Sequence, residues 1–342
     1  MGGTALTDNR KDSVASASTF SVAPMMDWTD RHCRYFHRQI SRHALLYTEM
    51  VTEQAVRLGD RDRLLGFDPA EHPVALQLGG SDPVGLAEAA RIGAGHGYGE
   101  INLNVGCPSD RVQSGCFGAV LMKTPALVGD CVAAMAAAAP AVEITVKCRI
   151  GVDDQDPAEA LPALLRAVQD VGVRRVIVHA RKAWLQGLSP KDNRSIPPLD
   201  RPLVLAMKGA FPGLSIAVNG GIASLDEARM LLAAGFDGVM IGRAAYHAPY
   251  EILAGADTLI TGTPSTPPDR RAVVAAMRPY IARHLAAGGR LHAVTRHMLG
   301  LFAGQPGARR WRQVLTEGAA RPDAGPEVLD AALAAMPTQL AA

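Results

Sequence analysis

The sequence has no apolar run that approaches the roughly 18 residues needed to cross a bilayer as a helix. Its first 19 residues are small and polar with mixed charge, and they lack the apolar centre of a secretory signal. We therefore expect residues 1–19 to form a disordered tail. We also expect a cytoplasmic protein with no membrane partner.

Cysteine is scarce as well. The 342 residues include five cysteines, and no two of them have the close spacing of a C-x-x-C metal clip or of a small disulfide framework. No histidine-rich segment is present that could complete a zinc site. These absences argue against a disulfide-stabilised secreted protein, favour reduced thiols, and lead us to expect no metal site.

The G-x-G-x-x-G fingerprint of a dinucleotide-binding open sheet is missing after the first predicted strand. The chain instead has eight short apolar segments that alternate with predicted helices, and each segment ends in a polar or glycine-rich loop. The predicted strands are 20–25, 45–47, 74–78, 100–103, 144–149, 175–179, 216–219 and 238–241. The predicted helices are 31–40, with Asp27 or Thr29 as N-cap, and 51–58, 83–94, 125–139, 157–171 and 225–234. This pattern is typical of a (β/α)8 TIM barrel of about 250 residues, with a doubly wound sheet as the alternative.

Negative charge is missing from one long segment near the end of the chain. No Asp or Glu lies between Arg270 and Thr316, whereas nine Arg and three His do. A solvated helical face usually mixes both signs, so arginine without acids indicates a phosphate-binding surface, or else a merely cationic helical domain. Beyond a linker at 262–268 we predict helices at 270–287, 293–302, 308–315 and 327–335. We therefore expect a catalytic barrel at 20–262 and a small C-terminal helical domain at 269–335 that binds nucleic acid.

The stretch 100–123, EINLNVGCPSDRVQSGCFGAVLMK, is the most informative in the chain. Its first residues alternate as a strand does, and Gly106 and Pro108 then end the strand. Cys107 thus lies at the carboxyl end of a strand, where α/β enzymes place reactive groups. A buried structural cysteine is the alternative, but Asn104 and the polar loop favour chemistry.

Two glycine sites follow the last two predicted strands, Asn219-Gly220-Gly221 and Gly242-Arg243. Backbone N–H groups at helix starts bind phosphate, and barrels commonly hold a phosphate at these two loops. The pattern therefore indicates a ligand that carries a phosphate, although a lone Gly-Gly can also be a simple turn.

Polar and basic residues end other strands. Lys147 and Arg149 are two apart and face the same side of their strand, either to meet an anionic ligand or to form a salt bridge with an acid. Gln77, Asn104 and His179 could bond a ligand's ring edge or only one another.

The stretch 100–123 resembles the tRNA-dihydrouridine synthases, flavin enzymes that reduce a uridine ring in tRNA. The resemblance rests on Asn-x-Gly-Cys-Pro before a Gly-rich loop that ends in Leu-Met-Lys, and it extends from Phe20 to about Leu315. It implies that Cys107 is the general acid. It also implies that FMN is bound by Pro24, Met25, Met26, Gln77, Lys147, His179, Asn219, Gly220, Gly221, Gly242 and Arg243.

Two further segments are similar to the A subfamily, which acts on D-loop uridines 20 and 20a. They are ARKAWLQGLSPKDNR at 180–194 and GQPGARRWR at 304–312. The implied reaction is driven by NADPH, with hydride passing from flavin N5 to uracil C6 and a proton from Cys107 to C5. We expect a monomer that contacts tRNA through Asn104, Lys182, Lys191, Arg194, Arg296, Arg309, Arg310 and Arg312.

Two other functions have to be weighed against this one. A flavin barrel that acts on a free pyrimidine, like dihydroorotate dehydrogenase, would need no arginine-rich surface. A tRNA-binding module without chemistry would not need the set of polar groups at the strand ends. Both alternatives therefore leave part of the sequence unexplained.

Overall fold

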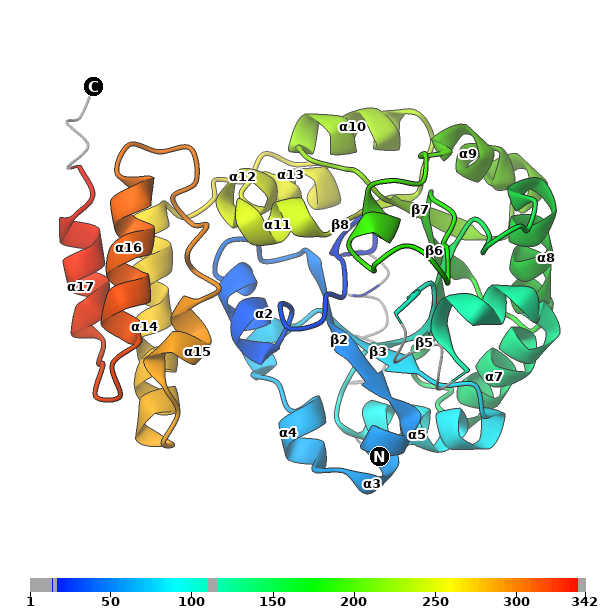
Figure 1. Ribbon diagram of the computed structural model, residues 1–342, viewed down its shortest axis with the longest axis horizontal. Helices are drawn as coiled ribbons and strands as arrows, with labels where there is room; N and C mark the ends of the chain where they lie inside the picture. The colour runs from blue at the N-terminus through cyan, green and yellow to red at the C-terminus, as the bar shows by residue number, and fades with distance from the viewer. Residues whose placement is uncertain (1–13, 15–16, 110–115, 338–342) are drawn as a thin grey trace.

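The computed structural model describes residues 14, 17–109 and 116–337. Eight parallel strands form a closed barrel in which each strand pairs with the next and β8 pairs with β1, which confirms the predicted TIM barrel (Figure 1). The strands are β1 Phe20–Val22, β2 Leu45–Thr52, β3 Val74–Gly79, β4 Glu100–Val105, β5 Glu143–Arg149, β6 Arg175–His179, β7 Ser215–Asn219 and β8 Gly238–Ile241. Strand β2 runs five residues past its predicted end at Tyr47, whereas β1 stops at Val22 before the proline.

Helices surround the barrel. Those that follow β1 to β7 are α2 Arg31–Arg38, α3 Glu53–Leu58, α5 Pro83–Gly95, α7 Pro125–Ala138, α8 Pro157–Asp170, α9 Arg201–Ala210 and α10 Leu225–Ala233. Further short helices are α4 Arg61–Leu65, α11 Arg243–His247, α12 Pro249–Leu253 and α13 Ala256–Thr261, with 3-10 turns η1 Pro69–Glu71, η2 Gly118–Lys123 and η3 Asp192–Arg194. Sequence reasoning missed α9, which Asp200 caps. In the described part of the chain, no helix combines the length and the apolarity that a membrane span requires.

The interior of the barrel is separate from the main core between strands and helices. Because side chains alternate along each strand, one set faces the helices and the other faces the barrel axis. A small apolar cluster that includes Leu45, Ile177 and Met240 fills part of the interior. The same cluster contains Val14 and Ala17, so this end of the predicted tail packs against the barrel; residues 1–13 and 15–16 lie outside the described residues.

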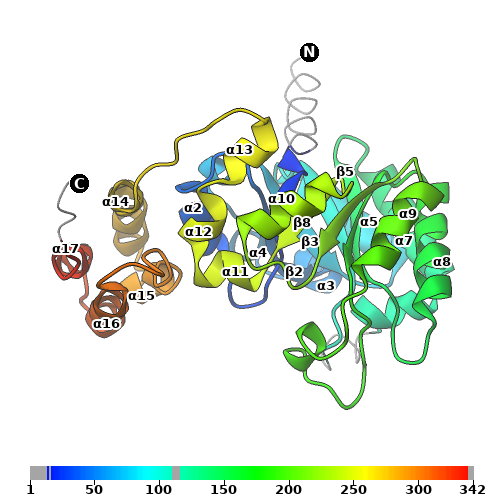
Figure 2. The same ribbon diagram turned by 90° about the horizontal axis from the view of Figure 1, so that it is seen from above.

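Four helices follow the linker and lie beside the barrel next to α2 (Figures 1 and 2). They are α14 Arg270–Ala286, α15 Leu291–Thr295, α16 Ala308–Ala319 and α17 Glu327–Ala334. The helix predicted at 293–302 ends early at Thr295, and the one predicted at 308–315 continues to Ala319. Trp311 of α16 is fully buried. Its ring packs on Phe302 and its Nε1 donates to the Met298 carbonyl at 3.1 Å, so it links α16 to the segment before it.

The C-terminal helices contact the barrel chiefly through α2. Tyr280 stacks on Tyr35 with ring centroids 4.0 Å apart. Asp30 is the N-cap of α2, so the predicted caps Asp27 and Thr29 were wrong. Asp27 lies in the left-handed region at φ 64°, and the hydroxyl of Thr29 is bonded to the backbone of Met25.

Candidate active site

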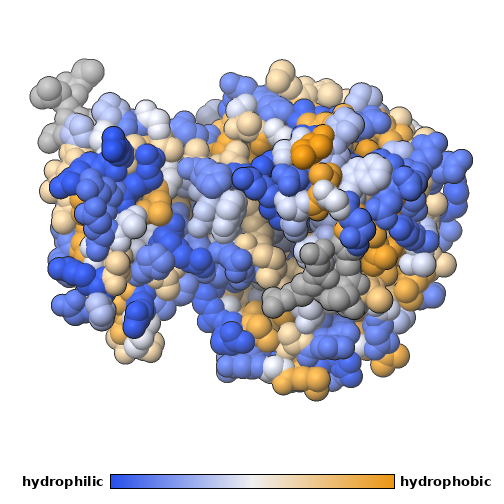
Figure 3. Space-filling view, viewed as in Figure 1, coloured by the Kyte–Doolittle hydropathy of each residue, from blue (hydrophilic) through white to orange (hydrophobic). Residues whose placement is uncertain are grey.

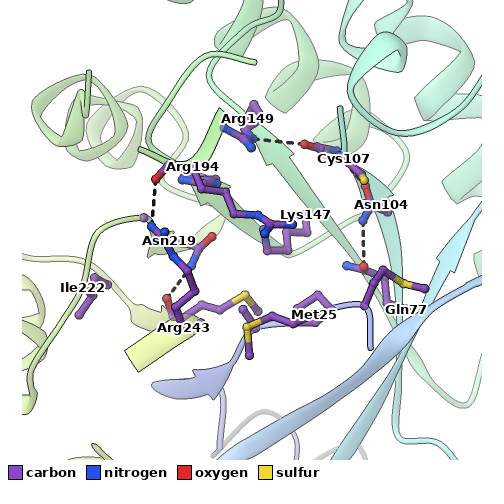
Figure 4. A pocket seen from close by; sticks show the side chains of 18 of the residues that line it. Met25, Gln77, Asn104, Cys107, Lys147, Arg149, Arg194, Asn219, Ile222 and Arg243 are labelled. Atoms are coloured by element: carbon purple, nitrogen blue, oxygen red, sulfur yellow. Dashed lines mark hydrogen bonds between the residues drawn. The ribbon is translucent and has the colours of Figure 1, made fainter. Parts of the chain in front are cut away.

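A cavity of about 300 Å³ lies at the carboxyl ends of the strands (Figure 4). It brings together all eleven residues predicted to bind FMN, together with three residues predicted to act on the substrate. These lining residues are Pro24, Met25, Met26, Gln77, Asn104, Cys107, Lys147, His179, Arg194, Asn219, Gly220, Gly221, Gly242 and Arg243. Residues from distant parts of the chain thus meet at one place.

Sequence reasoning missed several lining residues, mostly apolar ones. They are Ala23, Trp28, Met50, Gly106, Pro108, Ile222, Ala223, Met240 and Ala244. Met50 was missed because the predicted strand 45–47 is too short, and a longer strand would have placed it near the mouth. Trp28 stacks on Tyr246 at 4.5 Å, a tertiary contact that no local pattern indicates.

Hydrogen bonds from the Asn104 side chain and from η2 hold the Cys107 loop in place. The Oδ1 of Asn104 accepts from the N–H groups of Gly106 (3.0 Å) and Cys107 (2.9 Å). The carbonyl of Cys107 accepts from the N–H of Ala119 at 2.9 Å. The Cys107 thiol is half-buried, with its Sγ 3.5 Å from the hydroxyl of Ser109. The thiol therefore occupies a defined position in the cavity wall.

The two basic residues of β5 have different surroundings. Arg149 is buried and donates to the carbonyls of Gly106 (3.2 Å), Lys182 (3.2 Å) and Asn193 (2.8 Å), so it ties loops together. Burial, and then the positive charge of Arg149, lowers the pKa of Lys147 to about 8. Among the described residues neither side chain forms the salt bridge that was the alternative. Lys147 is therefore a cation available to a ligand.

The first glycine site forms a tight turn against His179. Gly220 and Gly221 have φ values of 113° and 72°, and a Cβ on Gly220 would lie 2.6 Å from Cδ2 of His179. His179 is buried, and its Nε2 has no hydrogen-bond partner among the described groups. Burial, and then the charges of Arg149 and Lys147, holds the pKa of His179 well below its usual value. A neutral imidazole with an unused nitrogen thus lines the cavity.

The loop between β6 and α9 rims the cavity and projects beyond the strands (green in Figure 2). Asn193 is fully buried and braces this loop, since its side chain bonds both the N–H (2.7 Å) and the carbonyl (2.9 Å) of Trp184. Arg194 lines the cavity, and its carbonyl accepts from Arg243. Lys182 lies over the exposed Trp184 ring, and Lys182 and Lys191 stay outside the cavity lining.

The C-terminal arginines fall into two groups. Four of the nine in the acid-free segment pair with acids from other parts of the chain, as Arg270 with Glu251, Arg278 with Asp330, Arg283 with Asp68, and Arg296 with Asp30. The other group includes Arg309, Arg310 and Arg312, which are exposed on α16 and have no acid partner in the described ranges. The face of this unit seen in Figure 3 is mostly hydrophilic. The α16 arginines are therefore free to meet an external anion, as are the exposed Arg271 and Arg290, but only α16 carries three of them within four positions.

Comparisons with known proteins identify the family to which the chain belongs. The family described as dihydrouridine synthase (Dus) matches residues 21–336. The chain is 53% identical to a tRNA-dihydrouridine(20/20a) synthase of Shewanella oneidensis, over 98% of this chain and 99% of that one. It is 55% identical to the Escherichia coli K12 protein of the same name, over 94% and 93%. An old yellow enzyme homologue from Zymomonas mobilis shares the fold, with a TM-score of 0.51 at 12% identity over 75% of this chain and 92% of that one. The family predicted from the stretch 100–123 is thus confirmed, and the chain belongs to the dihydrouridine synthases.

Proposed function

We propose that the protein reduces uridine to 5,6-dihydrouridine in the D-loop of tRNA at positions 20 and 20a, with FMN as cofactor and NADPH as reductant. One observation carries the proposal: Cys107 lies in the wall of the same cavity that all the predicted FMN-binding residues line. The names of the relatives from Shewanella oneidensis and Escherichia coli support the same reaction and the same positions.

The residues around the cavity fit FMN. The buried Nε2 of His179 lacks a partner among the described groups, and the turn at Gly220 and Gly221 lines the cavity with backbone alone. Gln77 and Lys147 would bind the polar edge of the ring, while Gly242 with the other glycine site would bind the phosphate. Bound FMN would supply the hydride that reduces the C5–C6 double bond of uracil.

The protein's own residues provide the proton and orient the base. The Cys107 S–H bond breaks as its proton passes to C5, and the hydride and the proton together account for the two hydrogens gained. Asn104 uses one amide N–H on Gln77, and its other N–H is our candidate donor to a uracil oxygen. A uridine in folded tRNA has to leave its stack to reach this depth.

The surface outside the cavity would bind the rest of the tRNA. Arg309, Arg310 and Arg312 would contact phosphates from the helical domain at 269–335, and Lys182, Lys191 and Arg194 would do so from the rim. Arg296, which we also predicted as a phosphate contact, is bonded to Asp30, so it could offer only its remaining N–H groups.

The test is to incubate the purified protein with unmodified tRNA, FMN and NADPH and to map dihydrouridine by position. We expect product at 20 and 20a, and we expect Cys107→Ala to lower turnover by about 10²–10⁴-fold while FMN and tRNA binding persist. Cys116→Ala is the matched control, since Cys116 is exposed and does not line the cavity. Product at another D-loop position would refute the assignment of the 180–194 loop. NADPH consumption without dihydrouridine would favour the free-pyrimidine alternative.

A further inference from the structure

A continuous chain of hydrogen bonds, buried except for its last member, crosses the inside of the barrel between β5 and β3. The hydroxyl of Thr145 donates to Oε1 of Glu100 at 2.5 Å and accepts from Nδ2 of Asn102 at 2.8 Å. The Oδ1 of Asn102 accepts from Nε2 of Gln77, and Oε1 of Gln77 accepts from Nδ2 of Asn104, both at 2.8 Å (Figure 4 shows the last bond). Glu100, Asn102, Thr145 and Gln77 are at most 1% exposed.

The groups at the two ends permit only one direction of donation. Glu100 forms an ion pair with Arg175 at 2.5 Å, and a carboxylate can only accept. At the other end, Asn104 meets the backbone N–H groups of Gly106 and Cys107, which can only donate. Every carboxamide between these ends therefore has one orientation that satisfies both of its neighbours. A reversed amide at Asn102, which is fully buried, would set N–H against N–H and oxygen against oxygen in a space that water does not reach.

The inner wall on the other side of the barrel has a different character. Its buried residues include Leu45, Ile177, Ala217 and Met240, which is the apolar filling usual for such barrels. The polar wall of β3 to β5 is thus not a general requirement of the fold. It leads to the loop that carries Cys107.

We propose that Thr145 and Asn102, neither of which lines the cavity, are positioning residues that fix the orientation of the Gln77 and Asn104 carboxamides and, through Asn104, the position of Cys107. The functional meaning of that position rests on the proposed uridine reduction. In this arrangement Gln77 presents one amide N–H and one carbonyl lone pair that no described residue uses. A ligand ring edge that offers an acceptor beside a donor matches these two groups.

The test compares three substitutions that affect the same carboxylate. Thr145→Val keeps the shape of the side chain and removes the hydroxyl, whereas Thr145→Ser keeps the hydroxyl. Tyr47→Phe is the matched control, because the Tyr47 hydroxyl also donates to Oε1 of Glu100 at 2.5 Å but leads to no carboxamide. If Thr145→Val does not fold, Thr145→Ala makes the same comparison without a methyl group against Asn102.

Two measurements report the position of the residues at the end of the chain of bonds. The first is the alkylation rate of Cys107 by iodoacetamide in flavin-free protein, followed by mass spectrometry. Trypsin cleaves at Arg111 and so separates Cys107 from Cys116, which serves as the internal reference. The second is the FMN dissociation constant, from the quenching of flavin fluorescence. For Thr145→Val we expect Cys107 to react several-fold faster and FMN to bind about tenfold more weakly, since an unpaired amide is free to rotate.

We expect Thr145→Ser and Tyr47→Phe to stay within about twofold of the wild type in both measurements, because the directed bonds are kept. The proposal is overturned if Thr145→Val also stays within that range. It is equally overturned if Tyr47→Phe or Thr145→Ser changes Cys107 as much as Thr145→Val does, since general loosening or packing would then be the cause. Dihydrouridine formation by the wild type is measured in parallel. Its absence would refute the proposed function, while the alkylation rates would still test the positioning role.

Discussion

Replacement of Asp30 tests how the C-terminal helices are held on the barrel. The Asp30 carboxylate caps α2 by accepting from the N–H groups of His32 (2.9 Å) and Cys33 (3.0 Å). Its Oδ2 also accepts from Arg296 at 2.6 Å and from Nε2 of His297 at 3.1 Å. Asp30→Ala removes all four bonds, whereas Asp30→Asn keeps a good cap and removes the charge.

The expected loss can be worked out from these contacts. The cap contributes about 1 kcal/mol. The pair with Arg296, a third of whose side chain is exposed, contributes about 0.5–1 kcal/mol. The side chain of His297 is fully buried and would be left with no partner among the described residues, at a cost of about 1–2 kcal/mol. We therefore expect Asp30→Ala to lower the free energy of unfolding by about 3 kcal/mol and Asp30→Asn by about half as much.

The effect should depend on pH in a defined way. Burial alone would raise the pKa of Asp30, but the bond and charge of His297, with the bonds from Cys33 and Arg296, hold that pKa well below its usual value. A carboxylate with a depressed pKa stabilises the fold above its unfolded pKa of about 3.9, and this contribution is lost as the pH falls further. The gap in stability between the wild type and Asp30→Asn should therefore be full at pH 7 and shrink below about pH 4.

Urea unfolding of the three proteins at pH 7 and at lower pH measures these differences as shifts of the midpoint at constant slope. A loss below about 1 kcal/mol for Asp30→Ala would show that the network does not hold the helices. Equal losses for the two variants would show that the cap contributes nothing. If the difference in stability between the wild type and Asp30→Asn does not change with pH, the charge of the Asp30 carboxylate is not its cause.

Two further predictions concern binding. Replacement of Arg309, Arg310 and Arg312 by Ala should weaken tRNA binding and lower the salt dependence of log K by about three, one for each lost phosphate contact, as measured by filter binding at several salt concentrations. Arg229→Ala, at an exposed position of α10, should change neither quantity. An equal effect of that substitution would show that the α16 arginines have no specific role in tRNA binding. FMN affinity, measured by titration calorimetry, should fall as the pH rises through about 8, because the Lys147 ammonium then loses its proton. Lys147→Met should bind FMN weakly and without that pH dependence, and a persistent pH dependence would assign it to another group.

Much of the cavity could be predicted from the sequence because the carboxyl ends of parallel strands meet at one edge of a barrel. Gln77 and Asn219 lie far apart in the chain, yet each lies in the carboxyl-terminal half of its strand and so both reach the cavity. Trp28 could not be predicted in this way, because it reaches the cavity through a loop whose path depends on tertiary contacts such as the stack on Tyr246. The carboxyl end of β2, which includes Met50, could not be predicted because the apolar run in the sequence stops at Tyr47.

The C-terminal arginines show a different limit of sequence reasoning. The absence of acidic residues along 271–315 indicates a surface of net positive charge only if no other part of the folded chain brings acidic residues close to it. Arg296 and Asp30 are 266 positions apart and still form an ion pair. The three-dimensional arrangement therefore removes four of the nine arginines from the predicted phosphate surface, and three of those that remain lie together on α16.

The chain of hydrogen bonds inside the barrel could not be read from alternation alone, because alternation shows which side a residue faces but not which residue lies beside it. Strand register supplies that neighbour. Gln77 is paired with Asn102 between β3 and β4, and Asn102 with Thr145 between β4 and β5, so the three side chains lie at one level of the interior. A slip of one residue would turn the polar groups toward the helices and bring apolar ones inside. The backbone hydrogen bonds that close the barrel therefore also fix the order of donors and acceptors behind Cys107. The strand register, and not the loops, thus determines which polar groups of β3 and β4 face the cavity at this site.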